Sequence, residues 1–490
     1  MKHITIIGSG LSGLSASCYL AKNGYKVTLI DKNSKPGGRL SYFEKNGYKF
    51  DMGPSWYWMP DVFEKFFNDF NKNSKDYYTL KRLDPSYKFF FEDNDQDVPA
   101  DFNQLCKLYE SYEKGSSLKL KKFINQSEKK YNISLSHFIS LPNNKISEYF
   151  SMNILKHIFT LDLFKPLRKH INSYFKNKKI RDMLEFPSMF LGGSPQNTPA
   201  LYSLMNYADI IKGTWYPMGG MYEITKAFSK LSKELGVVHI YNDEIKKFNI
   251  ENNKIISIKS DKNIYKSDYY ISCAEYPHVQ LDLINKNNNT YNKSYWSKRN
   301  VAPSSLIFYL GLNKKIKKLK HHNLFFDKDF DTHLDDIFNK KVWPKEPLFY
   351  VCCPSKTDSN VVPNKNSENL FILIPIGSGS IDNQKLRDKY YKDTIKRIEE
   401  KIGEPINDNI IVKESFCVND FIKHYNSFKG NAYGLANTLF QTALFKPKLK
   451  DKKIKNLFYT GHFTVPGPGL PPAIISGKIV ANQIMKENIS

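Results

Sequence analysis

Cysteine is scarce in this sequence, and its spacing follows no metal or disulfide pattern. The 490 residues contain six cysteines, none of which forms a C-x-x-C pair or joins histidines at the spacing of a zinc site. Small disulfide scaffolds and structural zinc modules space their cysteines regularly. The pattern therefore argues against both classes, predicts no metal site and fits a reducing cytoplasm. The six are Cys18, Cys106, Cys273, Cys352, Cys353 and Cys417.

Long apolar runs are also missing. No stretch of about 18 uncharged apolar residues occurs, so we expect no membrane-spanning helix. The apolar start, MKHITIIGSG, is too short for a secretory signal peptide and leads at once into a glycine motif. We therefore expect a cytoplasmic protein whose first residues belong to the fold.

Acidic residues are too few to balance the basic ones, which leaves a formal net charge of +24. Two basic clusters stand out, at Lys314–His322 and Lys446–Lys455. They fit either a solvated surface or attraction to an anionic membrane, where each basic residue contributes about 1 kcal/mol. Nothing resembling a nucleic-acid-binding module accompanies the charge, so no nucleic-acid partner is expected.

A dinucleotide-binding motif opens the chain. Gly8, Gly10 and Gly13 form G-x-G-x-x-G between a short apolar strand and an amphipathic helix. The first glycine permits a tight turn, the second lets the backbone approach a pyrophosphate, and the third lets the helix pack on the strand. Asp31 closes the next strand, where a carboxylate can bind a ribose diol. The unit predicts a parallel sheet of the Rossmann-like α/β class.

The choice between FAD and NAD rests on the residues that follow. Gly37, Gly38 and Arg39 resemble the second phosphate and flavin motif of large FAD-dependent amine oxidases and desaturases. The chain contains no second G-x-G-x-x-G, so no further domain for NAD(P)H is expected. These features predict FAD as the cofactor.

Composition changes along the chain predict two interleaved domains. Strand and helix patterns typical of a nucleotide-binding domain return after a long stretch that is rich in Lys, Asn and Tyr and that includes a helical pattern over 137–164. We expect a discontinuous FAD-binding domain and a mixed α+β substrate-binding, membrane-associating domain. The first spans 1–70, 215–285 and 450–490, and the second 71–214 and 286–449.

One loop carries unusual apolar surface. The tract DMGPSWYWMP, residues 51–60, has the Gly and Pro residues of a loop, but it also carries two of the five tryptophans. Two other tracts, 186–191 and 463–470, likewise combine loop signals with bulky apolar residues. These tracts are candidates for the wall of an apolar binding site, with packing between domains as the alternative.

Four segments together resemble the bacterial carotenoid desaturases of the lycopene-forming phytoene desaturase type, in particular those of flavobacteria-like organisms. They are residues 6–57, GTWYPMGGMYEITKAF (213–228), SCAE (272–275) and the Gly/Pro-rich 456–484. The resemblance spans essentially the whole chain. It implies an FAD domain of the amine oxidase and p-hydroxybenzoate hydroxylase topology, interleaved with the substrate domain and attached peripherally to the inner membrane.

The resemblance also assigns residues. It implies a hydrocarbon substrate, for which Trp56, Tyr57, Trp58 and Met59 of the aromatic loop are candidate wall residues, with packing between domains as the alternative. It implies FAD contacts at Gly8, Gly10, Ser12, Gly13, Asp31, Lys32, Gly38, Arg39, Ile245, Gly461, Gly469, Leu470, Pro471 and Pro472.

No catalytic base can be carried over from the resemblance. The family's His-Pro-Gly tripeptide reads Val465-Pro466-Gly467 here, with His462 displaced upstream. Asp162 and Arg168 do not have the spacing of the family's Arg/Asp pair. His462 is a candidate base near the flavin or a loop residue bonded to backbone, and the catalytic residues stay unassigned.

The activity that the resemblance implies is stepwise conversion of phytoene to lycopene by hydride transfer to flavin, with oxygen or a quinone as electron acceptor. Alternatives with the same fold are a dehydrosqualene desaturase, another carotenoid desaturase or isomerase, and an amine oxidase. A non-enzymatic carrier of prenyl lipids, of the GDP-dissociation-inhibitor type, is a further alternative.

Overall fold

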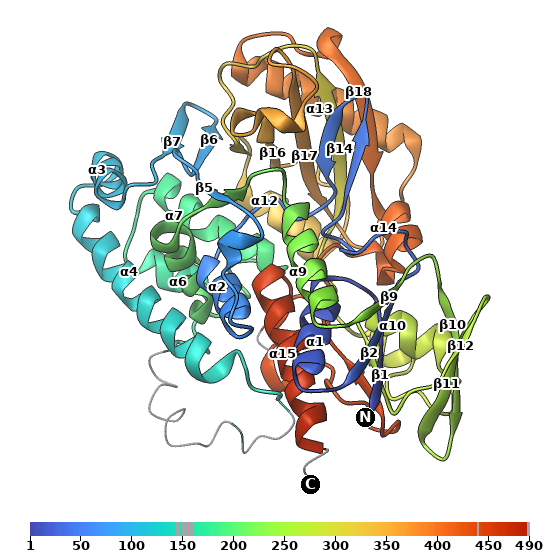
Figure 1. Cartoon of the computed structure of the whole chain (residues 1–490). Helices are drawn as coiled ribbons and strands as arrows, with labels where there is room; N and C mark the ends of the chain where they lie inside the picture. The colour runs from blue at the N-terminus through green and yellow to red at the C-terminus, as the bar shows by residue number, and fades with distance from the viewer. Residues whose placement is uncertain (144–147, 149–160, 439–440, 488–490) are drawn as a thin grey trace.

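The computed structural model describes residues 1–143, 148, 161–438 and 441–487 (Figure 1). Most of the helical pattern expected over 137–164 lies outside these residues. The described elements form two large sheets with helical layers around them. In Figure 1 the larger sheet lies at the top, and the parallel sheet lies lower, beside the chain's two ends.

The parallel sheet has five strands and contains the predicted strand–turn–helix unit. The motif helix, α1 (Leu11–Lys22), connects two neighbouring strands of the sheet. All four strand pairs are parallel, as expected for short apolar strands with helical crossovers. In spatial order the strands are β19 (Leu457–Tyr459), β13 (Tyr269–Ser272), β1 (His3–Ile7), β2 (Lys26–Ile30) and β9 (Val238–Ile240).

Both faces of this sheet are covered. On one face, α1 packs between α9 (Tyr222–Glu234) and α15 (Leu470–Glu487), and their buried side chains share one apolar core with the sheet. On the other face lies an antiparallel sheet of β10 (Ile245–Glu251), β11 (Lys254–Ser260) and β12 (Ile264–Tyr265). The N-terminal halves of α1 and α15 contact one another through the Ser15 hydroxyl, which donates to the Ile474 carbonyl oxygen at 2.7 Å. In sheets of this kind ligands bind beyond the carboxyl ends of the strands.

The larger sheet has seven strands and two different faces. Side chains alternate, so that even-numbered residues of β14 such as Leu306 and Phe308 pack under α13 (Gln384–Ile402), whereas Ile307 and Tyr309 face a second core. The order is β18 (Ile410–Phe416), β14 (Ser304–Leu312), β17 (Glu368–Ile376), β16 (Phe349–Cys352), β15 (His322–Phe326), β6 (Tyr87–Phe91) and β7 (Asp95–Val98).

Shorter elements complete the fold. Two small antiparallel pairs are β3 (Tyr42–Lys45) with β4 (Tyr48–Asp51), and β5 (Leu80–Arg82) with β8 (Trp215–Pro217). The remaining α-helices among the described residues are α2 (Pro60–Asn68), α3 (Phe102–Tyr112), α4 (Ser116–Ile133), α6 (Leu167–Asn172), α7 (Lys178–Glu185), α8 (Leu204–Tyr207), α10 (Tyr276–His278), α11 (Lys293–Ser297), α12 (Phe330–Leu334) and α14 (Val418–Tyr425). None of the described helices is both long and apolar enough to span a membrane.

The two sheets draw on different parts of the chain. The parallel sheet uses strands between residues 3 and 30, 238 and 272, and 457 and 459, and the seven-stranded sheet uses strands between 87 and 98 and between 304 and 416. The exact bounds of the two domains stay a prediction.

Candidate functional site

A cavity of about 440 Å³ runs between the two sheets. At one end it is lined by the glycine turn after β1 and by the first residues of α15. At the other end it reaches aromatic side chains beside the seven-stranded sheet. Clefts of this size that join two structural units are common ligand sites.

The glycine motif leaves an open anion site at the first end. No described side chain caps the N-terminus of α1, so its first backbone N–H groups are available to a phosphate. A Cβ added at Gly10 would meet no described atom within 4 Å. At Gly13 a Cβ would lie 2.2 Å from the Gly8 carbonyl oxygen, so only glycine allows α1 to pack this closely.

Asp31 directly follows β2, and its carboxylate holds the glycine loop through Ser9. Its carboxylate accepts hydrogen bonds from the backbone N–H of Ser9 (2.7 Å) and from the Ser9 hydroxyl (2.6 Å). Its other oxygen accepts from the Asn33 backbone N–H (2.8 Å). The carboxylate lines the cavity, so it both holds the loop and lies where a ribose diol is expected.

A buried carboxylate holds two basic side chains at the middle of the cavity. Glu275 Oε2 accepts from Arg39 Nη2 and contacts His462 Nε2, each at 3.1 Å. Its second oxygen accepts from the Asn431 side-chain amide (2.7 Å) and the Phe428 backbone N–H (3.0 Å). The Glu275 side chain is fully buried, whereas Arg39 and His462 keep 24% and 21% of their side-chain surface exposed. Glu275 therefore positions two side chains that a ligand can reach.

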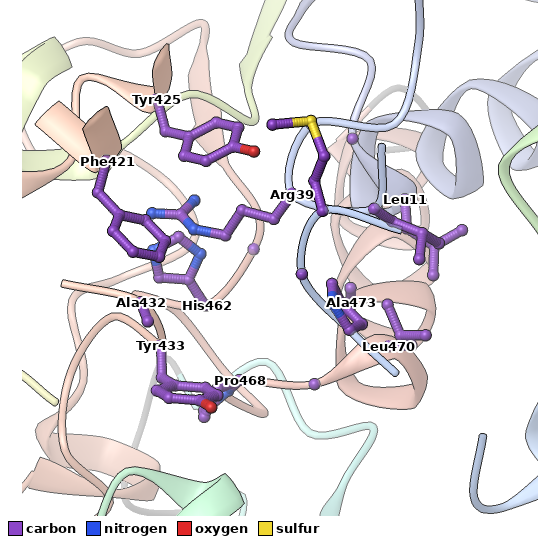
Figure 2. A pocket seen from close by; sticks show the side chains of 18 of the residues that line it. Leu11, Arg39, Phe421, Tyr425, Ala432, Tyr433, His462, Pro468, Leu470 and Ala473 are labelled. Carbon is purple, nitrogen blue, oxygen red and sulfur yellow. The ribbon is translucent and has the colours of Figure 1, made fainter. Parts of the chain in front are cut away.

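Figure 2 shows how this group faces the cavity. The Arg39 guanidinium lies beside His462 and over the ring of Tyr425, whose centroid is 5.1 Å away. Leu470 and Ala473, from the start of α15, lie on the opposite side. The positive N-terminal end of α15 thus borders the space that Arg39 faces.

The pKa values of this group follow from burial and from mutual attraction. Burial alone would raise the pKa of the Glu275 carboxyl, but Arg39, His462 and the Asn431 amide lower it to about 2. Burial and the Arg39 charge lower the pKa of His462, against the opposite effect of Glu275. At neutral pH the site therefore holds a carboxylate, a guanidinium and a neutral imidazole.

The low pKa of Glu275 predicts a pH-dependent stability. In the unfolded chain the carboxyl titrates near its ordinary pKa of 4.5, and in the folded chain near 2. Its contribution is therefore complete above pH 4.5 and is lost as the pH falls toward 2, an effect on the order of 3 kcal/mol. Urea unfolding of the wild type and Glu275→Gln across this range measures it. A difference in unfolding free energy that does not change with pH would contradict the account.

The far part of the cavity is apolar. Trp56 and Trp58 come from the aromatic loop, and their rings contact Phe186 and Phe190 at centroid distances of 5.4–6.3 Å. Within the part of the chain that the structure describes, the lining side chains here carry no charge. We call this region the apolar part; it comprises Trp56, Trp58, Met59, Phe186, Phe190, Leu324, Phe326, Phe338 and Tyr350.

The structure brings most of the predicted site residues together. Gly13 and Tyr57 lie outside the cavity lining: Gly13 packs α1 on β1, and Tyr57 stacks on Phe63 at 4.4 Å and bonds the Tyr78 hydroxyl at 2.9 Å. The predicted residues that line the cavity are Gly8, Gly10, Ser12, Asp31, Lys32, Gly38, Arg39, Trp56, Trp58, Met59, Ile245, Gly461, Gly469, Leu470, Pro471 and Pro472.

The two apolar tracts away from the first loop also reach the cavity. Residues 186–191 form a short 3₁₀ helix, and Phe186, Met189, Phe190 and Leu191 line the wall. From the tract 463–470, Pro468, Gly469 and Leu470 do so.

Sequence reasoning assigned no role to Glu275, although it lies in the quoted SCAE segment. A signal was present, because Glu275 follows the parallel strand β13, and ligands bind beyond the carboxyl ends of such strands. Asp162 and Arg168 lie elsewhere: Asp162 pairs with Lys130 at 2.9 Å, and Arg168 pairs with Glu185. They form structural ion pairs outside the cavity lining.

The residues present fit a flavin dinucleotide. Arg39 Nε is buried and has no hydrogen-bond partner among the described residues, so a donor is left over beside the cavity. Open space beside Gly10 and the uncapped N-terminus of α1 supply the anion site. Arg39, Ser12 and the α15 N-terminus would hold such a group.

Comparison with known proteins identifies the family of this chain and solved structures that share its fold. The family described as flavin containing amine oxidoreductase matches residues 11–485. The chain is 36% identical to a carotenoid 3,4-desaturase of Haloarcula japonica, over 99% of this chain and 98% of the relative. It is 29% identical to a zeta-carotene-forming phytoene desaturase of Myxococcus xanthus, over 99% and 94%. The structure of putrescine oxidase with bound putrescine matches at a TM-score of 0.62 and 11% identity, over 99% of both chains, which confirms the predicted fold class.

Proposed function

Because the chain belongs to the flavin-containing amine oxidoreductase family, and within it to the carotenoid desaturases, we propose that it is an FAD-dependent enzyme that converts phytoene stepwise to lycopene. The observation that carries the proposal is the division of the cavity into a polar, anion-binding end and an apolar part without charged lining. A long hydrocarbon offers no polar group, so its binding must come from apolar burial, at about 25 cal/mol per Å².

The chain's own residues have separable roles in this proposal. When bound, the flavin supplies the hydride acceptor for carbon–carbon desaturation. Trp56, Trp58 and the rest of the apolar part hold the chain and exclude water. Glu275 contacts Nε2 of the neutral His462 imidazole, and our proposal assigns to the other nitrogen of this ring the proton lost from the neighbouring carbon.

A second candidate function is 3,4-desaturation of a finished carotenoid. It is favoured by the 36% identity to the Haloarcula 3,4-desaturase, against 29% to the phytoene desaturase of Myxococcus. An amine oxidase is disfavoured, because its cationic substrate would need a carboxylate partner. Among the described residues, the apolar part has no carboxylate in its lining.

Expression in cells that accumulate phytoene tests the main proposal. We expect lycopene, identified by the absorption spectrum of the extract. Parallel cells that accumulate lycopene, or the C30 precursor dehydrosqualene, test the alternatives. Unchanged phytoene together with new 3,4-double bonds in lycopene would favour the second candidate. A folded, colourless protein that leaves every substrate unchanged would favour a prenyl-lipid carrier.

Trp58→Ala tests the apolar part. Trp58 lines the cavity and donates from Nε1 to Thr214 at 2.8 Å, whereas the adjacent Tyr57 faces away. Truncation of either buried ring is expected to cost about 3–5 kcal/mol of stability. Only Trp58→Ala is expected to change the ratio of lycopene to shorter polyenes, with flavin content retained. Chromatography of the products measures the ratio, and an equal change in Tyr57→Ala would refute the role.

Attachment to a membrane surface and the electron acceptor, oxygen or a quinone, stay predictions. Some lysines of the two basic clusters are already paired or buried, which weakens the case for attachment to a membrane. Lys318 and Lys320 of the first cluster pair with Asp95 and Asp97, at 2.8 and 3.4 Å. In the second cluster, Lys446 is buried, which lowers its pKa to about 7. Flotation with anionic liposomes measures the attachment.

A further inference from the structure

Three donor groups of metal-ligand type meet in the interior, behind the wall of the apolar part. One ligand atom from each of His321, His322 and Cys352 lies within 4.8 Å of those of the other two, and all three residues are buried. We propose that this cluster is a site for a borderline-soft divalent cation of the Zn²⁺ class. The site lies outside the flavin-binding end and is independent of the reaction proposed above.

Sheet register brings these residues together. Strands β15 and β16 pair antiparallel, with His322 directly opposite Cys352. Directly opposite side chains on one face have Cβ atoms about 4.5–5.5 Å apart, within reach of one ion. His321 precedes the strand, and its ring lies edge-on to that of His322 at a centroid distance of 4.5 Å.

Nδ1 of each imidazole is already held by a hydroxyl group. His321 Nδ1 bonds Thr357 Oγ1 at 2.7 Å, and His322 Nδ1 bonds the Tyr350 hydroxyl at 2.6 Å. Metal-ligating histidines typically use one ring nitrogen for such a bond and the other for the ion. Here Nε2 of both rings is buried without a hydrogen-bond partner in the described structure. A buried nitrogen without a hydrogen-bond partner is unfavourable, and a bound cation would remove that cost.

Space and charge next to the cluster also suit a cation. A small cavity of about 10 Å³, close to the space for one water, is lined by Cys352, Tyr216 and Asp51. The Tyr216 hydroxyl is buried and has no partner among the described residues. A water there would complete four-fold coordination, and the Asp51 carboxylate would offset the charge left after two imidazoles and a thiolate bind Zn²⁺.

The donor set indicates the class of ion. Two imidazole nitrogens and one thiolate favour Zn²⁺ over Mg²⁺ or Ca²⁺, which prefer oxygen ligands. Zn–N and Zn–S bonds of about 2.0–2.3 Å require the three donors to close in by about 1 Å. The His322 ring stacks on Trp56 at a centroid distance of 4.0 Å, so the ion would also fix one wall of the apolar part.

Cobalt titration of the full-length protein, without an affinity tag and after chelator treatment, tests the site. Co²⁺ replaces Zn²⁺ and reports its ligands by colour. We expect one equivalent of Co²⁺ with a thiolate-to-cobalt charge-transfer band and the strong visible bands of four-coordinate cobalt. One equivalent of Zn²⁺ should abolish both. Absence of a stoichiometric band would overturn the proposal.

Neighbouring cysteines give a matched pair of variants. Cys352→Ser should lose the charge-transfer band and bind Co²⁺ at least tenfold more weakly. Cys353→Ser should behave as the wild type, because Cys353 belongs to the opposite core and contacts Glu368. His321→Gln is a second variant outside the strand, expected to weaken binding while circular dichroism stays unchanged. A band that survives in Cys352→Ser, or disappears equally in Cys353→Ser, would refute the site.

Discussion

Replacing Glu275 with alanine is expected to release the flavin and to lower the free energy of unfolding by about 3–5 kcal/mol. The carboxylate is fully buried and holds Arg39 and His462 at 3.1 Å each. Its removal leaves a guanidinium with no other carboxylate within bonding distance in the described structure, together with two donors, from Asn431 and Phe428, without their acceptor. Urea unfolding and the ratio of flavin to protein absorbance measure the two effects.

Glu223→Ala provides the control for this change. Glu223 also pairs with two basic side chains, Lys49 and Lys226, but keeps 21% of its side-chain surface exposed. Because Glu223 is partly open to water and its partner Lys226 is 52% exposed, Glu223→Ala should lose less stability than Glu275→Ala and should keep its flavin. If Glu275→Ala kept its flavin and lost no more stability than Glu223→Ala, Glu275 would not organise the site.

Two alanine substitutions in the glycine motif are expected to separate folding from cofactor binding. At Gly13 a Cβ would lie 2.2 Å from the Gly8 carbonyl oxygen, so Gly13→Ala must push α1 away from β1. We expect loss of flavin and a loss of at least about 3 kcal/mol in the free energy of unfolding. The clashing atom belongs to the Gly8 backbone, which cannot move aside as a flexible side chain could. Gly10 has φ −66°, which alanine adopts, and no described atom lies within 4 Å of its Cβ position.

Gly10→Ala should therefore fold normally and yet lose most of its flavin. The added methyl fills the space that the backbone leaves for a pyrophosphate. Thermal unfolding of the cofactor-free proteins separates the two variants, and titration with FAD measures affinity. Normal FAD binding by Gly10→Ala would show that the dinucleotide does not approach this turn.

Local patterns were enough to predict which residues line the glycine-rich end of the cavity. The glycine motif, Asp31 and the tract through Arg39 lie within the first 39 residues, and short-range rules of strand, turn and helix fix their positions. Contacts between residues far apart in the sequence could not be predicted from such local patterns. Glu275 meets Arg39 across 236 residues, and nothing local to either residue specifies that pairing.

The aromatic loop shows a second limit. Trp56, Tyr57, Trp58 and Met59 were all expected at the substrate, and the structure turns Tyr57 away toward Phe63 and Tyr78. Helices and strands have a period that assigns faces to residues, but a loop has none. The His321, His322 and Cys352 cluster escaped detection for a related reason, because sheet register and not sequence spacing brings it together.

Anaerobic mixing of the flavin-loaded protein with phytoene in liposomes tests the central claim most directly. The claim is that an apolar chain binds in this cavity and gives up a hydride to the flavin. We predict bleaching of the flavin absorbance in a single turnover, with one new double bond for each flavin reduced and recovery of the colour on admission of oxygen. Bound phytoene together with unbleached flavin would contradict the proposed phytoene desaturase activity.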